Sequence, residues 1–135
     1  MASELRVNTL KDAAGNNSIA TSFVAGGSAK AWINFNGTGT IATRDSFNIS
    51  SIADDGTGDY ITTVTSAMSN NDYSIVGNCA PNYGVKFSIN LQIMHGNNSA
   101  EIDNSTSAQQ VQTVDVGETV FDSKYITHNL QGDLA

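Results

Sequence analysis

Residues 30–60 read KAWINFNGTGTIATRDSFNISSIADDGTGDY and give the clearest indication of the fold. Apolar and polar residues alternate at the start of this stretch, so one face of an extended strand would carry Ala31, Ile33 and Phe35. Trp32 would lie on the opposite face. Asn36 and Gly37 supply the positive-φ positions of a hairpin turn, and the acidic, glycine-rich residues 54–59 form a second turn. The stretch therefore predicts three short, half-buried strands joined by tight turns.

The same alternation recurs along most of the chain and is clearest in residues 85–94. Further predicted strands cover residues 18–24, 73–79, 109–114 and 120–127. Residues 96–107 are polar and predict a long exposed loop. No segment keeps helical spacing over three turns, so little helix is expected. The predicted fold class is all-β: an antiparallel two-sheet β-sandwich of about eight or nine strands, with a jelly roll as one variant.

The chain has 135 residues, which fits one domain. We expect a single β-sandwich domain over 1–135, in which residues 1–17 form an extended N-terminal arm and 129–135 a C-terminal tail. Cys79 is the only cysteine, so an intrachain disulfide is excluded and a small buried residue is expected. The opening MASELRVNTL has neither the basic nor the apolar region of a signal peptide, and no segment approaches the roughly 20 apolar residues of a membrane span.

The charge of the chain argues against two classes of partner. Six Lys and Arg stand against thirteen Asp and Glu, which gives a formal net charge of −7. Nucleic acids and anionic membranes are bound through clustered basic residues, and the six basic residues are mostly far apart in sequence. Only 14% of the residues are charged, and neutral Asn, Ser, Thr and Gly take their place. We therefore expect no nucleic-acid partner and no membrane insertion.

Two groups of residues are candidate metal ligands. Asp54, Asp55 and Asp59 could hold calcium, but they lack EF-hand spacing and fit an ordinary Asp/Gly turn better. His95 and His128 are the only histidines, and neither has a second His or Cys at ligand spacing. Copies of one histidine could meet on a symmetry axis of a homo-oligomer, although isolated histidines are more often surface or hydrogen-bonded residues. The expectation is no metal and no cofactor.

The sequence offers no catalytic motif, and its aromatic residues favour a binding role. It contains no G-x-S-x-G, no H-E-x-x-H and no phosphate-cradling glycine loop, so no catalytic residue is assigned and no enzyme is expected. Trp32, Tyr83 and Tyr125 are the candidate interface residues, for subunit contacts or for stacking on sugars. Trp32 is expected to be buried, either in an oligomer interface or under a neighbouring segment.

Three stretches carry a resemblance to a known family. SELRVNTLKDAAGNNSIA at residues 3–20, the long run from KAWINFNGTGT through RDSFNISS and DDGTGDY within residues 29–79, and FDSKY at 121–125 resemble small structural proteins of marine tailed phages, notably cyanophages. The family is described as tail-fibre-like or virion structural proteins. Its members continue after FDSKY with an apolar closing strand, whereas this chain continues with ITHNLQGDLA.

The resemblance implies a virion protein with a β-sandwich fold and homotrimeric assembly, and it carries over no catalytic residue. The first hypothesis is a tail-fibre-like or adhesion module, with other virion proteins as partners and a host surface glycan as a further candidate. The alternative is a capsid decoration or cement protein that stabilises the head. Both place the protein on the exterior of the virion after synthesis in the host cytoplasm.

Overall fold

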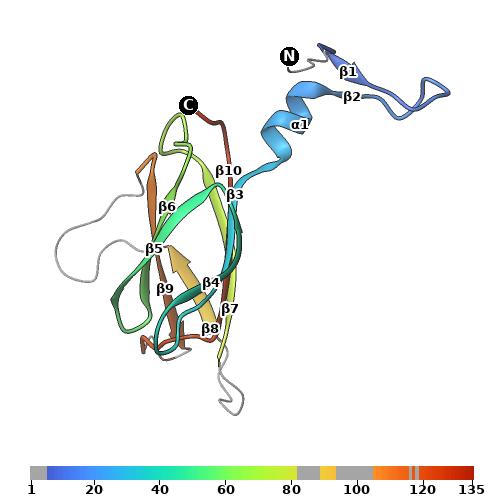
Figure 1. Cartoon of the computed structure of the whole chain (residues 1–135). Helices are drawn as coiled ribbons and strands as arrows, with labels where there is room; N and C mark the ends of the chain where they lie inside the picture. The colour runs from blue at the N-terminus through green and yellow to red at the C-terminus, as the bar shows by residue number, and fades with distance from the viewer. Residues whose placement is uncertain (1–5, 82–88, 94–104, 116, 118) are drawn as a thin grey trace.

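The computed structural model describes residues 6–81, 89–93, 105–115, 117 and 119–135. Two antiparallel four-stranded sheets face each other, and a hairpin followed by one short helix stands outside them (Figure 1). The prediction of an all-β, antiparallel sandwich is confirmed, with eight strands in the two sheets and two more in the outer hairpin. No helix among the described residues is long and apolar enough to cross a membrane.

The two sheets are built from strands that are far apart in sequence. The first sheet has the order β4-β3-β10-β7, with β3 at Ala29–Asn36, β4 at Ala42–Phe47, β7 at Ser74–Ala80 and β10 at Tyr125–Gln131. The second sheet has the order β5-β6-β9-β8, with β5 at Ile49–Gly56, β6 at Asp59–Val64, β8 at Ile89–Ile93 and β9 at Ala108–Asp115. Of the predicted strand over 85–94, residues 89–93 are strand, and the rest lies outside the described residues.

The connections differ from the jelly-roll variant considered above. Three pairs of consecutive strands, β3–β4, β5–β6 and β8–β9, each stay within one sheet, whereas the chain of a jelly roll mostly alternates between its sheets. The chain passes from β4 to β5 through the single residue Asn48, whose φ of 55° suits asparagine. Its amide donates to the carbonyls of Lys30 and Ser66, at 3.0 and 3.1 Å, and so fixes the corner between the sheets.

The core lies between the sheets and contains the predicted apolar face of β3. Ala31, Ile33 and Phe35 are buried, and the Phe35 ring meets the Tyr60 ring edge to face at 5.2 Å. The other large buried apolar side chains come mainly from β9 and β10: Val111, Val114, Ile126 and Leu130. Cys79 is buried as predicted.

The turn after β3 is longer than predicted. The sequence placed positive φ angles at Asn36 and Gly37, but the glycine with positive φ is Gly39, at 64°, and β4 begins only at Ala42. Gly37 instead allows the side chains of Tyr60 and Ile126 to pack closely against the backbone. A Cβ there would lie 2.6 Å from Cζ of Tyr60 and 2.7 Å from Cδ1 of Ile126. Packing, and not turn geometry, therefore requires glycine at this position.

The N-terminal region is separate from the sandwich. β1 at Thr9–Leu10 pairs with β2 at Ile19–Ala20, and α1 follows at Thr21–Gly27. The predicted strand over 18–24 is therefore wrong beyond Ala20. No neighbouring strand is paired with this segment, and local helical hydrogen bonds satisfy its backbone instead. We call residues 6–28 the arm; it extends further than the expected 1–17. At the other end, β10 includes residues 129–131, which were expected in a tail.

Candidate functional site

The outer face of the first sheet gathers the exposed aromatic and amide side chains of the sandwich. Strand register sets Phe47, Trp32, Asn129 and Val76 side by side in one row across the four strands. The next row that points outward contains Asp45, Asn34, Thr127 and Asn78. We call these eight residues, together with Tyr125, the outer face. Because side chains alternate along a strand, they point away from the core that Ile33 and Phe35 fill.

Three of the four residues in the first row of the outer face are apolar and exposed. Phe47 is 55% exposed and Val76 57% exposed, at the two edges of the row. Trp32 lies between Phe47 and Asn129 and is 37% exposed, so the described part of the chain covers it only in part. Trp32 is thus only partly buried within the described chain, and its burial in an oligomer interface stays a prediction. Exposed apolar side chains that adjoin one another are typical of surfaces that bind a partner.

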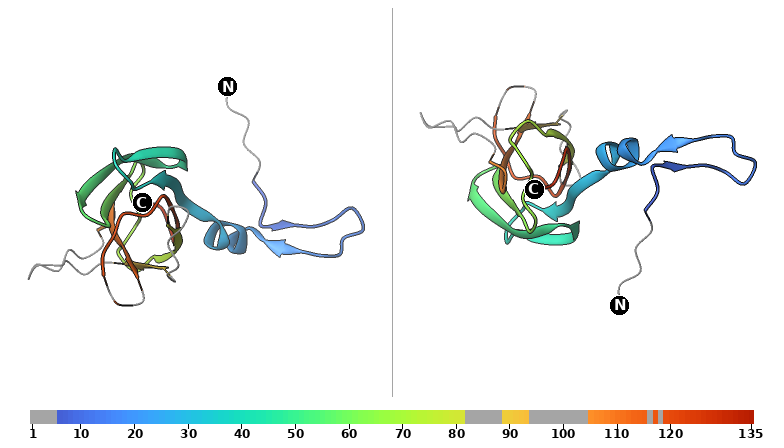
Figure 2. Two further views of the ribbon diagram at one scale, coloured as in Figure 1. Left: turned by 90° about the horizontal axis from the view of Figure 1, so that it is seen from below. Right: turned by 90° about the horizontal axis from the view of Figure 1, so that it is seen from above.

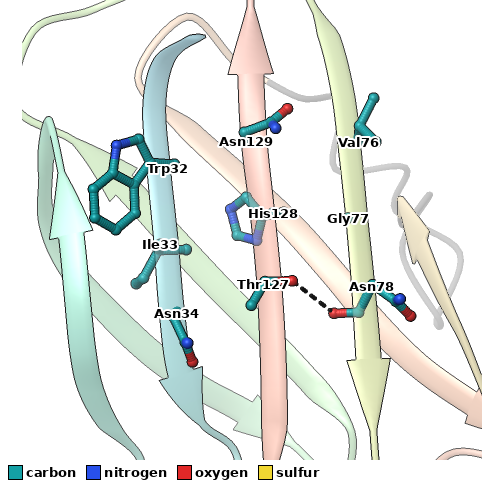
Figure 3. Close-up of a pocket in the computed structure, with 9 residues that line it drawn as sticks. All are labelled: Trp32, Ile33, Asn34, Val76, Gly77, Asn78, Thr127, His128 and Asn129. Atoms are coloured by element: carbon teal, nitrogen blue, oxygen red, sulfur yellow. Dashed lines mark hydrogen bonds between the residues drawn. The ribbon is translucent and has the colours of Figure 1, made fainter.

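A groove of about 570 Å³ runs over the outer face between Trp32 and Val76 (Figure 3). Its other lining residues are Ile33, Asn34, Gly77, Asn78, Thr127, His128 and Asn129. Three of them contribute neutral amides, and the Thr127 hydroxyl donates to the Asn78 carbonyl at 3.4 Å. The Asn129 side-chain oxygen is buried and has no hydrogen-bond partner within the chain. The groove thus offers one indole ring and several uncharged polar groups.

His128 is the only titratable residue in the groove lining, and it belongs to the core. It is 3% exposed, and burial lowers its pKa to about 4, so the ring is neutral at pH 7. Its Nε2 lies 3.1 Å from the hydroxyl of Thr62, and that hydroxyl lies 3.4 Å from Oε1 of Gln109. Gln109 in turn donates to the Tyr73 hydroxyl at 3.2 Å. The groove lining therefore contains no pair of titratable groups placed for acid–base chemistry.

Tyr125 lies on the same outer face, at the far end from Trp32. The Arg44 guanidinium stacks on its ring with 4.5 Å between Cζ and the ring centroid. Two hydrogen bonds of 2.6 Å hold that guanidinium, one to the carbonyl of Phe35 and one to that of Lys124. Trp32 and Tyr125 thus share a face but not a pocket. Tyr83, the third candidate residue, lies outside the described residues, as does His95.

The acidic residues 54–59 form a turn held by a hydrogen bond within it and by bonds to the neighbouring strand β9. Asp54 accepts a hydrogen bond from the backbone of Gly56 at 3.1 Å, and both oxygens of Asp59 accept from the side-chain amide of Gln110, at 2.8 and 2.9 Å. Burial raises the pKa of the Asp59 carboxyl. Among the described residues, no three His, Cys, Asp or Glu side chains are grouped to hold a metal ion. Burial also raises the pKa of the Cys79 thiol to about 11, which makes it a poor nucleophile at pH 7.

Sequence reasoning placed Trp32 and Asn34 on one face of the strand, because they stand at the spacing of two that defines a strand face. Phe47, Val76 and Asn129 could not be placed there, because they join Trp32 only through the pairing of four strands that are distant in sequence.

The chain matches no family model, and neither a curated protein nor a solved structure matches it. The outer face therefore has to be interpreted from its own chemistry, and the likeness to phage structural proteins remains a prediction from the sequence motifs.

Proposed function

We propose that this chain is a virion structural protein without enzymatic activity, a tail-fibre-like or adhesion module that assembles as a homo-oligomer. The motif resemblance supports the virion role, and one observation supports the assembly. With the exception of Leu134, the exposed large apolar residues of the described chain fall on only two surfaces. Those on the arm are Val7, Leu10, Ile19, Phe23 and Val24, and those on the outer face are Trp32, Phe47, Val76 and Tyr125. Apolar surface concentrated in this way is typical of protein–protein contact.

The assembly is tested by the mass of the full chain in solution. Light scattering after size exclusion should give a multiple of the 14.2 kDa protomer at micromolar concentration, and a trimer is the specific expectation from the phage resemblance. Replacing Phe47 and Val76 by serine should shift the mass toward the monomer, because an apolar contact is lost. Ser51→Ala, an exposed change on the second sheet, is the matched control. A wild-type chain that stays monomeric contradicts the proposal.

Capsid decoration is the alternative role, because a cement protein would also use exposed apolar surface against its neighbours. The two roles differ in position on the particle. Gold-labelled antibody against this chain should mark the tails of intact virions if the tail-fibre role is right. Labelling confined to the heads would replace it with the decoration role.

Glycan binding is a second candidate function, and the groove beside Trp32 favours it. Indole rings stack on sugar faces, and the neutral amides of Asn34 and Asn78 can bond to hydroxyl groups. Trp32 is the only tryptophan, so its fluorescence reports this site directly. Titration with neutral oligosaccharides should quench or shift the emission, and Asn34→Ala should weaken the response. An unchanged spectrum across a glycan panel would remove glycans from the proposal.

A further inference from the structure

The arm has almost no interior of its own. Every residue from 6 to 28 is exposed except Ala20 and Thr21, which are half-buried, and α1 has seven residues with no buried side chain and no side-chain N-cap. Its hairpin consists of two strands of two residues each. Helices and hairpins this short are marginal in water when nothing packs against them. The arm therefore needs a surface to pack against.

The arm also presents apolar side chains that such a surface would cover. Leu10 and Ile19 are directly opposite each other in the hairpin. Phe23 and Val24 follow within α1, and Phe23 is 74% exposed. Together these side chains form an exposed apolar surface on the arm.

The sandwich of the same chain does not provide that surface. Ser28, the cap of α1, has the extended angles φ −87° and ψ 143° and leads directly into β3. The Lys30 ammonium donates to the carbonyls of Ala25 and Ser28 and so ties the end of α1 to the start of β3. In the views along the sandwich, from below and from above, the arm projects sideways and away from both sheets (Figure 2). The arm is thus directed toward another molecule.

A second copy of this chain offers a surface of matching chemistry. Its outer face leaves Phe47, Trp32 and Val76 between 37% and 57% exposed, so a partner could still bury a large part of each side chain. The charges do not oppose this contact: residues 1–28 have two basic residues against two acidic ones, whereas residues 29–135 have four basic against eleven acidic ones. A neutral N-terminal region meets no net repulsion from an acidic sandwich, whereas two sandwich faces would repel each other.

We propose that the arm of one copy packs its apolar side chains against the outer face of a second copy, over the row formed by Phe47, Trp32 and Val76. This inference rests on the proposed homo-oligomer and names the contact that builds it. Both surfaces are present on every copy, so a ring of copies would cover them all, as head-to-tail contacts do when they close. The same contact would bury the indole of Trp32.

Serine substitutions on the full chain test the contact. Val24 and Leu134 are equally exposed, at 43%, but only Val24 belongs to the arm, so Val24→Ser and Leu134→Ser form a matched pair. Phe23→Ser and Val24→Ser should each raise the dissociation constant of the oligomer about tenfold or more and shift the Trp32 emission to the red, because each loses apolar contact worth at least 1.4 kcal/mol. Leu134→Ser should leave both unchanged.

Cross-linking locates the contact and separates the two proposals. In a Cys79→Ala background, chains with Ser22→Cys are mixed with chains with Asn78→Cys and treated with a short bismaleimide. Cross-linked pairs should form here and not with Ser51→Cys as the partner. If the oligomer persists unchanged in Phe23→Ser and no arm-to-face cross-link forms, this contact is wrong while the proposed assembly stands. A monomeric wild type would overturn both and point to a different virion protein as the arm's partner.

Discussion

The arm and the sandwich carry similar apolar side chains and use them in opposite ways. Phe35 in β3 is completely buried between the sheets, whereas Phe23 in α1 is 74% exposed. The hydrogen bonds differ in the same sense: those of the sandwich join residues far apart in sequence, such as Thr62 and His128, while those of Asp12 in the arm reach only residues 14–17. The sandwich therefore has the contacts of an independent fold, and the arm has those of a segment that gains stability from a partner.

Truncating the two phenylalanines should produce the largest contrast. Phe35→Ala removes a buried ring and leaves a cavity, so the free energy of unfolding should fall by about 3–5 kcal/mol. Phe23→Ala should change it by less than about 0.5 kcal/mol in dilute solution, where the chain is monomeric. Urea unfolding at low and high protein concentration measures both. If the loss of unfolding free energy in Phe23→Ala grows with protein concentration, the arm gains stability from a partner. A large loss at high dilution would contradict the comparison.

Acidification should destabilise the sandwich through His128. The folded pKa of about 4 lies below the ordinary 6.5, so as pH falls the unfolded chain takes up the proton first. The stabilisation is therefore complete above about pH 6.5 and is lost between pH 6.5 and 4, by about 3 kcal/mol at most. We expect His128→Gln to flatten this part of the stability profile measured by urea unfolding. The arm segment 6–28 contains no histidine, so its amide exchange, corrected for intrinsic rates, should not follow the same pH dependence.

A methyl group added at two glycines should have opposite effects in the two regions. At Gly37 a Cβ would meet Tyr60 and Ile126 well inside contact distance, so Gly37→Ala should lower the free energy of unfolding by about 1–3 kcal/mol. At Gly26, inside α1, nothing lies within 4 Å of the added atom. Gly26→Ala should favour the helix by about 0.5–1 kcal/mol, seen as slower amide exchange in the arm. Equal thermal shifts from both variants would mean that Gly37 is not tightly packed.

The sandwich could be predicted from sequence because its signal is local. The alternation of Ala31, Ile33 and Phe35 belongs to β3 alone and does not depend on what the strand pairs with. The closing strand was harder, because the buried positions of β10 after Tyr125 are Ile126, His128 and Leu130, and the histidine interrupts the apolar alternation. The strand is held by pairing on both sides with β3 and β7. Pairing between distant strands is a property of the whole fold.

The arm and the outer face could be predicted only in part, for a related reason. Residues 21–24 contain Phe23 and Val24, whose propensity favours strand, but without a neighbouring strand the segment forms a helix. The groove beside Trp32 needs four strands in register, and no single stretch of sequence contains that information. Composition nevertheless indicated that the groove would be polar and uncharged, since a chain rich in Asn and Thr places neutral polar side chains on its exposed strands.

The smallest contrast concerns single hydrogen-bonding groups. The Tyr60 hydroxyl lies 3.1 Å from the Gly37 carbonyl and 3.2 Å from an Asp122 carboxylate oxygen, both inside the sandwich. Tyr60→Phe should lower the free energy of unfolding by about 1 kcal/mol, because Asp122 keeps its bond to the Gly58 backbone and the ring still packs on Phe35.

The corresponding change in the arm is Asp12→Ala, which removes bonds of 3.1 and 2.8 Å from the backbones of Ala14 and Asn16. We expect faster amide exchange at the hairpin turn and no measurable change in the unfolding of the sandwich, because these bonds do not leave the arm. If Asp12→Ala destabilised the sandwich as much as Tyr60→Phe does, the two regions would unfold as one unit, and the arm would not be free to pack on another copy.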